Sequence, residues 1–203
     1  SYRKIRNTFR YLLGNLNDKF EDFDLEKIDI EKLPELEKFI LHKIFSLNKR
    51  FKSYFQNYDF HNLYKELLNF CTVDLSAFYF DIRKDTLYCD PINSEKRKSS
   101  IIVLNVLLNS LLRWFAPIIS FTTEEIYQLV SKQKKSVHLE KFLNFPKKFE
   151  NSNLSKKWIQ MLKIRDICNL SIEEKRSNKE IGSSLEANLE IKLNQKLFDL
   201  FKD

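Results

Sequence analysis

Three arginines and one asparagine near the start of the chain have the types and spacing that best fit a chemical role. Arg3, Arg6, Asn7 and Arg10 recur at intervals of three and four residues, and residues 1–16 contain no acid. This spacing places side chains on one face of an α-helix. Guanidinium groups along a face can contact successive phosphates, and Asn or Arg can also hydrogen-bond exposed base edges. The pattern predicts a nucleic-acid-binding face; the alternative is a solvated basic surface without a ligand.

A search for catalytic patterns gives no candidate. The sequence has no glycine-rich phosphate loop, no HxxxH or CxxC spacing, and no convincing Ser/His/acid or paired-carboxylate arrangement. His42, His61 and His138 are isolated, which favours packing or surface roles. We therefore predict that this chain catalyses no reaction alone and holds no cofactor or metal.

The cysteines and the apolar stretches indicate a cytoplasmic protein without a membrane segment. Cys71, Cys89 and Cys168 lie far apart, so neither a zinc site nor a disulfide framework is indicated. The most apolar stretch, residues 101–115, is interrupted by polar residues and is shorter than the roughly 20 residues that a bilayer requires. It is expected to be a core helix.

Other basic and aromatic residues allow two interpretations each. The lysines could extend the basic surface or only keep the protein in solution: Lys132, Lys134, Lys135, Lys147, Lys148, Lys156 and Lys157. Trp114 and Trp158 could stack on unpaired bases, but their apolar helical surroundings favour the core. The choice between base stacking and burial also arises for four aromatic residues: Phe78, Tyr79, Phe80 and Tyr88. Their surroundings favour a packed helix followed by a charged turn.

Composition favours long helices. Only 2 of 203 residues are glycine and 4 are proline, while 43% are hydrophobic. Glycine supplies the tight turns and phosphate loops of nucleotide-binding folds, so α/β architectures are disfavoured. The net charge of +7 permits an anionic partner without requiring one.

Apolar periodicity predicts a series of helices. In the first, over residues 2–16, the inward side chains should be Tyr2, Ile5, Phe9, Leu12, Leu13 and Leu16. A second helix should run from Pro34 to about Asn57. Asp59 is expected to cap a third helix, and Asp74 a shorter fourth that carries Leu75, Phe78 and Ile82 inward.

The second half of the chain should contain a central helix and a long final one. Residues 94–116 are apolar almost all the way round in their last turns, as in the middle of a bundle, and Pro117 ends the helix. Thr122 and Glu125 fit a capping box that opens a short helix. Beyond Pro146 a long helix should reach about Asn178, and residues 181–193 alternate as a strand does. We expect a helical bundle over residues 1–150, and a long helix with the start of a small α/β unit over residues 151–203.

Several segments resemble isoleucyl-tRNA synthetases. Residues 2–16, YRKIRNTFRYLLGNL, resemble the opening of that family's anticodon-binding domain. Residues 73–90, VDLSAFYFDIRKDTLYCD, and 111–128, LLRWFAPIISFTTEEIYQ, resemble its later signatures, followed by SVHLEKF and IGSSLEANLEI. The resemblance implies an all-α helical bundle of the class I synthetase anticodon-binding type, with a small C-terminal α/β appendage.

The resemblance also implies a function. Arg3, Arg6, Asn7 and Arg10 match the opening motif and are the implied tRNA contacts, whereas Lys4 matches but points elsewhere. The implied whole enzyme is a monomer that attaches isoleucine to its tRNA with ATP and Mg²⁺, in a catalytic domain before Ser1, and relatives can carry zinc beyond Asp203. The alternative is a non-catalytic helical protein-interaction module whose basic face binds an acidic partner.

Overall fold

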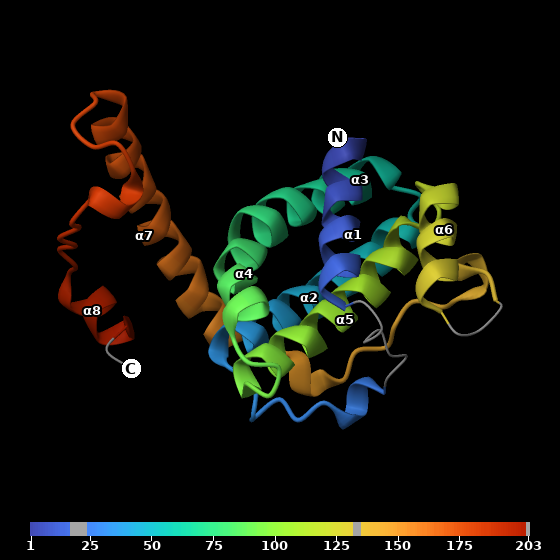
Figure 1. The fold of residues 1–203 in the computed structure, drawn as a ribbon. Coiled ribbons are helices and arrows are strands. Elements are labelled where there is room, and N and C mark those ends of the chain that lie inside the picture. The colour runs from blue at the N-terminus through green and yellow to red at the C-terminus, as the bar shows by residue number, and fades with distance from the viewer. Residues whose placement is uncertain (17–23, 132–134, 202–203) are drawn as a thin grey trace. The chain divides into compact units, whose positions relative to one another are not determined.

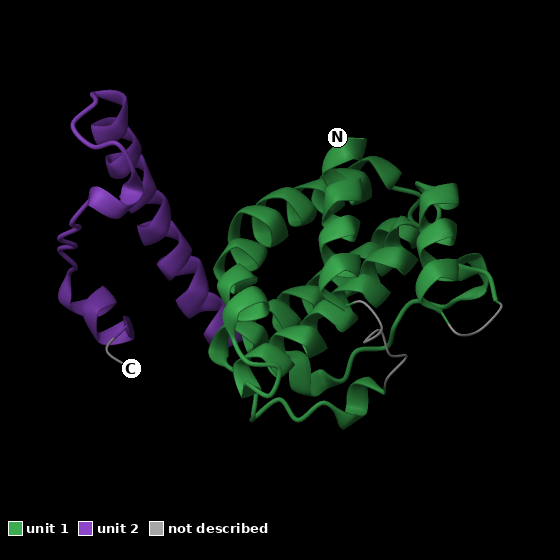
Figure 2. Ribbon diagram, viewed as in Figure 1, with its two compact units in different colours: residues 1–150 green, residues 151–203 purple. Residues whose placement is uncertain are grey.

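The computed structural model describes residues 1–16, 24–131 and 135–201, and the chain forms two compact units, residues 1–150 and 151–203 (Figures 1 and 2). The helices of the first unit are α1 (Tyr2–Leu16), α2 (Glu35–Gln56), α3 (Phe60–Asn69), the π-helix η3 (Phe70–Tyr79), α4 (Phe80–Cys89), α5 (Glu95–Phe115) and α6 (Ser120–Val130). Short 3₁₀ turns connect them: η2 (Leu25–Lys27), η4 (Val137–Leu139) and η5 (Lys147–Phe149).

The second unit is also helical. It contains α7 (Ser152–Ser177), the 3₁₀ turn η6 (Ser184–Glu186) and α8 (Gln195–Phe201). Within the described ranges no strand forms, so the strand predicted over residues 181–193 is wrong. The alternating apolar residues there have no second strand with which to exchange hydrogen bonds, and an isolated strand is not stable in water. The prediction of an all-α fold is confirmed.

Helix α5 is the centre of the first unit, as its sequence predicts. Every residue from Val103 to Phe115 is buried. Helices α1, α2, α4 and α6 all contact α5, and Figure 1 shows α1 crossing it. Burial on all sides explains why this helix is apolar around its whole circumference.

One predicted helix cap, Asp59, is confirmed, and Ser94 forms a cap that was not predicted. The Asp59 side chain accepts a hydrogen bond from the backbone N–H of Asn62 at 3.2 Å, and Ser94 Oγ accepts one from the N–H of Arg97 at 3.4 Å. Both satisfy donors that a helix start leaves without an intrahelical partner.

The other two predicted caps are wrong. Asp74 lies inside η3, within a continuous helical run from Phe60 to Cys89 (Figure 1), and pairs with Lys43. Helix α6 begins at Ser120, so Thr122 lies within it and makes no cap. The turn after Pro117 already starts this helix, with the Ile119 carbonyl accepting from the Thr123 N–H at 3.1 Å.

Candidate nucleic-acid interface

The apolar face of α1 fixes how this helix is rotated. Ile5, Phe9, Leu12 and Leu16 are all at most 1% exposed, and the helix packs on α5 and η3. The Phe9 ring contacts Phe115 edge to face, with ring centroids 5.9 Å apart. These four large side chains leave the helix one stable orientation on the bundle.

That rotation brings the predicted site residues to the surface together. Arg3, Arg6, Asn7 and Arg10 are all exposed. Among the described residues, none of the four side chains has a hydrogen bond or ion pair. The charges of this basic face, as we call these four residues, are therefore not neutralised by described neighbours, and the face can receive an anion.

The start of α1 is attached to α6. The hydroxyl groups of Tyr2 and Thr122 are hydrogen-bonded at 2.8 Å. Tyr2 is 45% exposed, so its predicted inward position is wrong, and its ring lies at the edge of the packed face. Leu13, also predicted inward, is half-buried. The contact with α6 holds the first turn of α1, which carries Arg3, to the bundle.

A hollow adjoins the basic face at the other end of α1. It has a volume of about 350 Å³ and is lined by Asn7, Arg10, Tyr11, Gly14, Asn15 and Tyr88. The first five lining residues come from α1, and the last comes from the end of α4. Two members of the basic face thus also belong to the hollow, and none of its described lining residues is an acid.

Tyr11 forms a rigid part of this lining. Its ring stacks on Phe80, with centroids 4.2 Å apart and an interplanar angle of 17°, and its hydroxyl donates to the Phe80 carbonyl at 3.3 Å. Burial raises the pKa of this hydroxyl above its ordinary value, and the nearby charges of Tyr88 and Asp81 raise it further. Tyr11 therefore stays a neutral phenol at physiological pH.

Tyr88 is the residue that the sequence interpretation missed. Phe78, Tyr79 and Phe80 are buried as predicted, but Tyr88 is 65% exposed. Trp114, by contrast, is a core residue as predicted, and its indole N–H donates to Asn48 Oδ1 at 3.1 Å. The buried side chains of α4 are Phe80, Arg83, Thr86 and Leu87, and Tyr88 lies outside this buried face.

The lysines that could extend the basic surface lie in different parts of the chain. Lys148 Nζ donates to the carbonyls of Glu26 and Ile28 at 2.5 and 2.9 Å, so it anchors a loop. Lys135 and Lys147 are exposed, whereas Lys156 and Lys157 belong to the second unit, and Lys132 and Lys134 lie outside the described residues.

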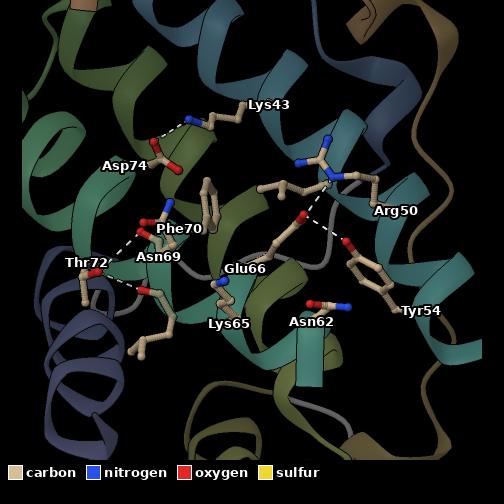
Figure 3. Close-up of a pocket in the computed structure, with 12 residues that line it drawn as sticks. Lys43, Arg50, Tyr54, Asn62, Lys65, Glu66, Asn69, Phe70, Thr72 and Asp74 are labelled. Carbon is tan, nitrogen blue, oxygen red and sulfur yellow. Dashed lines mark hydrogen bonds and ion pairs between the residues drawn. The ribbon is translucent and has the colours of Figure 1, made fainter. Parts of the chain in front are cut away.

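A second hollow, of about 690 Å³, lies between α2, α3 and η3 (Figure 3). Two of its three lining cations have acidic partners: Lys43 pairs with Asp74, and Arg50 Nε lies 3.1 Å from Glu66, which also accepts from the Tyr54 hydroxyl at 3.1 Å. Because these carboxylates already neutralise two of the cations, this hollow suits an anion less well than the basic face does.

The histidines and cysteines considered in the sequence show no arrangement for catalysis among the described residues. His42 is buried, and burial lowers its pKa below the ordinary value. His61 and His138 are exposed. Burial raises the pKa of the Cys71 thiol to about 12, so it stays protonated. The described residues contain no group of three or more His, Cys, Asp or Glu side chains that could hold a metal ion, and no described helix is long and apolar enough to cross a membrane.

Comparison with known proteins identifies the family. Residues 37–192 match the model of the anticodon-binding domain of tRNA ligase. The chain is 67% identical over its whole length to isoleucine–tRNA ligase of Pelagibacter ubique, of which it covers 22%. It is 43% identical to the enzymes of Agrobacterium fabrum and Brachyspira hyodysenteriae, over 92% of the chain and 19% and 20% of those relatives. The chain thus spans about a fifth of these relatives' length. The predicted resemblance is confirmed, and the chain belongs to the family of anticodon-binding domains of tRNA ligases.

Proposed function

We infer that this chain binds the anticodon stem and loop of isoleucine tRNA, as part of a longer isoleucine–tRNA ligase. The observation that carries this proposal is the basic face on α1, which is exposed and has no described acidic partner. The relatives' names and the family match support the same assignment. A protein-interaction module is not favoured, because neither finding points to a protein ligand.

The proposed mechanism is electrostatic gripping followed by base recognition. Arginines that neutralise phosphates release condensed counterions, which favours binding and makes it salt-dependent. Arg3, Arg6 and Arg10 follow one another by about one helical turn each, along a helix that four buried side chains hold in place. A rigid row of cations loses little conformational freedom on binding, and Asn7 adds an amide that can hydrogen-bond a base edge.

The whole protein is proposed to be a cytoplasmic monomer. Residues 1–150 would serve as the anticodon-binding bundle, and residues 151–203 would continue toward the C-terminal part of the enzyme. Activation of isoleucine with ATP and Mg²⁺ would take place in a separate catalytic domain, and any zinc site would also lie outside this chain. No residue of the chain is assigned to ATP or to either metal.

Fluorescence anisotropy with labelled isoleucine tRNA, across a salt series, tests the proposal. A tRNA of equal length with another anticodon serves as the comparison RNA. The matched variants are Arg6→Glu and Lys4→Glu, which change the charge equally on two faces of the same helix. We expect Arg6→Glu to weaken binding and to make the negative slope of log K against log salt shallower by about 0.7–0.9 or more. Lys4→Glu should have a smaller effect on both quantities.

The outcomes separate the alternatives. Preference for the isoleucine anticodon, lost in Arg6→Glu, supports direct recognition by this chain. Equal, salt-sensitive binding of both RNAs reduces the role to a phosphate-gripping platform. Absence of binding to either RNA contradicts the proposal and favours the interaction module.

A further inference from the structure

Gly14 borders open space in the hollow at the end of the basic face. A Cβ atom built on Gly14 would have no atom within 4 Å. Glycine is costly within a helix, because it loses more backbone freedom than alanine on folding. Its φ angle lies outside the left-handed region, so no backbone conformation requires glycine here. The consequence of Gly14 that the structure shows is the open space beside it.

The hollow offers both an aromatic surface and polar groups without described partners. Tyr88 is 65% exposed at one side, whereas Tyr11 is held against Phe80. Among the described residues, no hydrogen bond engages the side-chain amide of Asn7 or the guanidinium of Arg10. Asn15 Nδ2 donates to the Tyr11 carbonyl at 2.8 Å, which leaves its Oδ1 as an acceptor facing no described donor.

These features match the requirements of one unpaired nucleotide. Sequence-specific RNA recognition uses splayed-out bases that stack on aromatic side chains and hydrogen-bond through their edges. The volume of about 350 Å³ lies at the low end of the range of about 300–1,000 Å³ found for small-ligand pockets. An acid-free lining with an arginine at its rim also accepts the phosphate that accompanies each base.

We propose that this hollow is a base-binding subsite, in which one unpaired RNA base stacks on Tyr88 beside the Asn7 amide while Arg10 contacts its phosphate. The proposal rests on the function proposed above, and it adds the place where one unpaired base is held and the side chain, Tyr88, on which that base stacks. It predicts that the first unit distinguishes a loop from a helix of RNA.

The test compares two RNAs of equal length with the 203-residue chain: a hairpin with a seven-base loop that carries the isoleucine anticodon, and a fully paired duplex. Tyr88→Leu removes the aromatic ring and Tyr88→Phe keeps it; the residue is exposed, so both variants should fold. Loss of one base–aromatic stack weakens binding by about 5- to 150-fold. We expect that loss for the hairpin with Tyr88→Leu, and hairpin binding within about two-fold of the unsubstituted chain with Tyr88→Phe.

Two further readouts separate a base contact from a phosphate contact. Duplex binding and the salt slope should be unchanged by Tyr88→Leu, because no phosphate contact is removed. A 2-aminopurine placed in the loop should be quenched by the unsubstituted chain and by Tyr88→Phe, but not by Tyr88→Leu.

Gly14 supplies an independent pair of variants. Gly14→Leu adds a bulky side chain at a position where a Cβ atom meets no atom within 4 Å, and it should weaken hairpin binding selectively, whereas Gly14→Ala should change it by no more than about two-fold. Circular dichroism would verify that both fold.

The failures are distinguishable. If Arg6→Glu weakens both RNAs but Tyr88→Leu and Gly14→Leu bind the hairpin normally, the subsite is refuted and the proposed function stands. If the unsubstituted chain binds neither RNA, both proposals are overturned.

Discussion

At the residue scale, a buried ion pair and its hydrogen bonds join four helical segments of the first unit, α2, η3, α4 and α5. Glu37 on α2 is fully buried and accepts hydrogen bonds from Arg83 Nε at 2.6 Å and Nη2 at 2.5 Å. The Tyr79 hydroxyl donates to the same carboxylate at 3.3 Å, and Ser100 Oγ does so at 3.2 Å. Because the carboxylate has four donors, the cost of removing its charge from water is offset by a complete set of hydrogen bonds.

We predict that Arg83→Leu lowers the free energy of unfolding by about 3–5 kcal/mol, because it leaves the Glu37 carboxylate buried without its cation. Urea denaturation at neutral pH measures the change. The double variant Glu37→Leu with Arg83→Leu should recover much of the loss, since it removes both charges.

The matched control is the exposed pair of Lys84 and Asp81, whose atoms lie 3.0 Å apart with both side chains more than half exposed. Lys84→Leu should cost no more than about 1 kcal/mol. Equal effects of the two single variants would show that burial does not determine the strength of the Glu37 contact.

Gly14 is predicted to lower the stability of the unit. Gly14→Ala should raise the free energy of unfolding by about 0.5–1 kcal/mol, because alanine has less backbone freedom to lose and meets no described neighbour. Differential scanning calorimetry would measure a higher Tm. A lower Tm would mean that the added methyl group disturbs packing.

Whether a charged side chain is exposed or buried was the feature hardest to predict from the sequence. The exposure of Arg3, Arg6, Asn7 and Arg10 follows from helical spacing alone. The burial of Glu37 does not, since an acid in the first turn of a helix is ordinarily solvated and its partner lies 46 residues further along the chain.

At the element scale, sequence periodicity predicted most helices because their runs of apolar residues have clear ends. Helices α1, α2 and α5 begin and end within a residue or two of their predicted bounds, and α7 ends at Ser177, next to its predicted end at Asn178. The π-helix η3 was not predicted. Its wider turn lets Ser76 Oγ reach the Cys71 carbonyl at 2.8 Å, and it continues through Asp74, where a cap motif had suggested a new helix. Consequently Ile82, predicted inward from that start, is 40% exposed.

His42 provides a pH-dependent contact between α2 and η5. Burial lowers its pKa below 6.5, and Glu150 and the Phe149 backbone offset only part of the shift. Below the unfolded pKa, the unfolded chain therefore binds this proton more readily than the folded chain does. This group should reduce stability as the pH falls from about 6.5 toward the folded pKa, and contribute nothing above that window.

We predict that His42→Gln reduces the loss of stability between pH 6.5 and 5.5, whatever it does at pH 7.5. Urea midpoints at the three pH values for the unsubstituted chain and the variant would measure this. The exposed His61→Gln is the control and should leave the pH dependence unchanged. The same slope in all three proteins would contradict the assignment.

At the scale of the whole molecule, the buried core lies entirely in the first unit. All described buried residues fall between Ile5 and Phe149, and none lies in α7 or α8. Since burial of apolar surface is the main favourable term in folding, the first unit should be stable by itself.

We predict that residues 1–150 alone unfold cooperatively, with a Tm within about 4 °C of the 203-residue chain, a shift that corresponds to roughly 1 kcal/mol. Thermal unfolding followed by circular dichroism would test this. A much lower Tm, or loss of cooperativity, would show that residues 151–203 contribute to the core.

The packing of α1 on α5 has a consequence for synthesis. α1 ends at Leu16 and α5 begins only at Glu95. At about 5–20 residues per second, roughly 4 to 16 seconds of translation separate them. During that interval the nascent α1 lacks α5, and until η3 is made it lacks both helices on which its apolar side chains pack. The exposed arginines beside those side chains then favour solvation of the emerging segment. The basic face proposed to bind RNA would then also help to keep the nascent chain in solution before the bundle has folded.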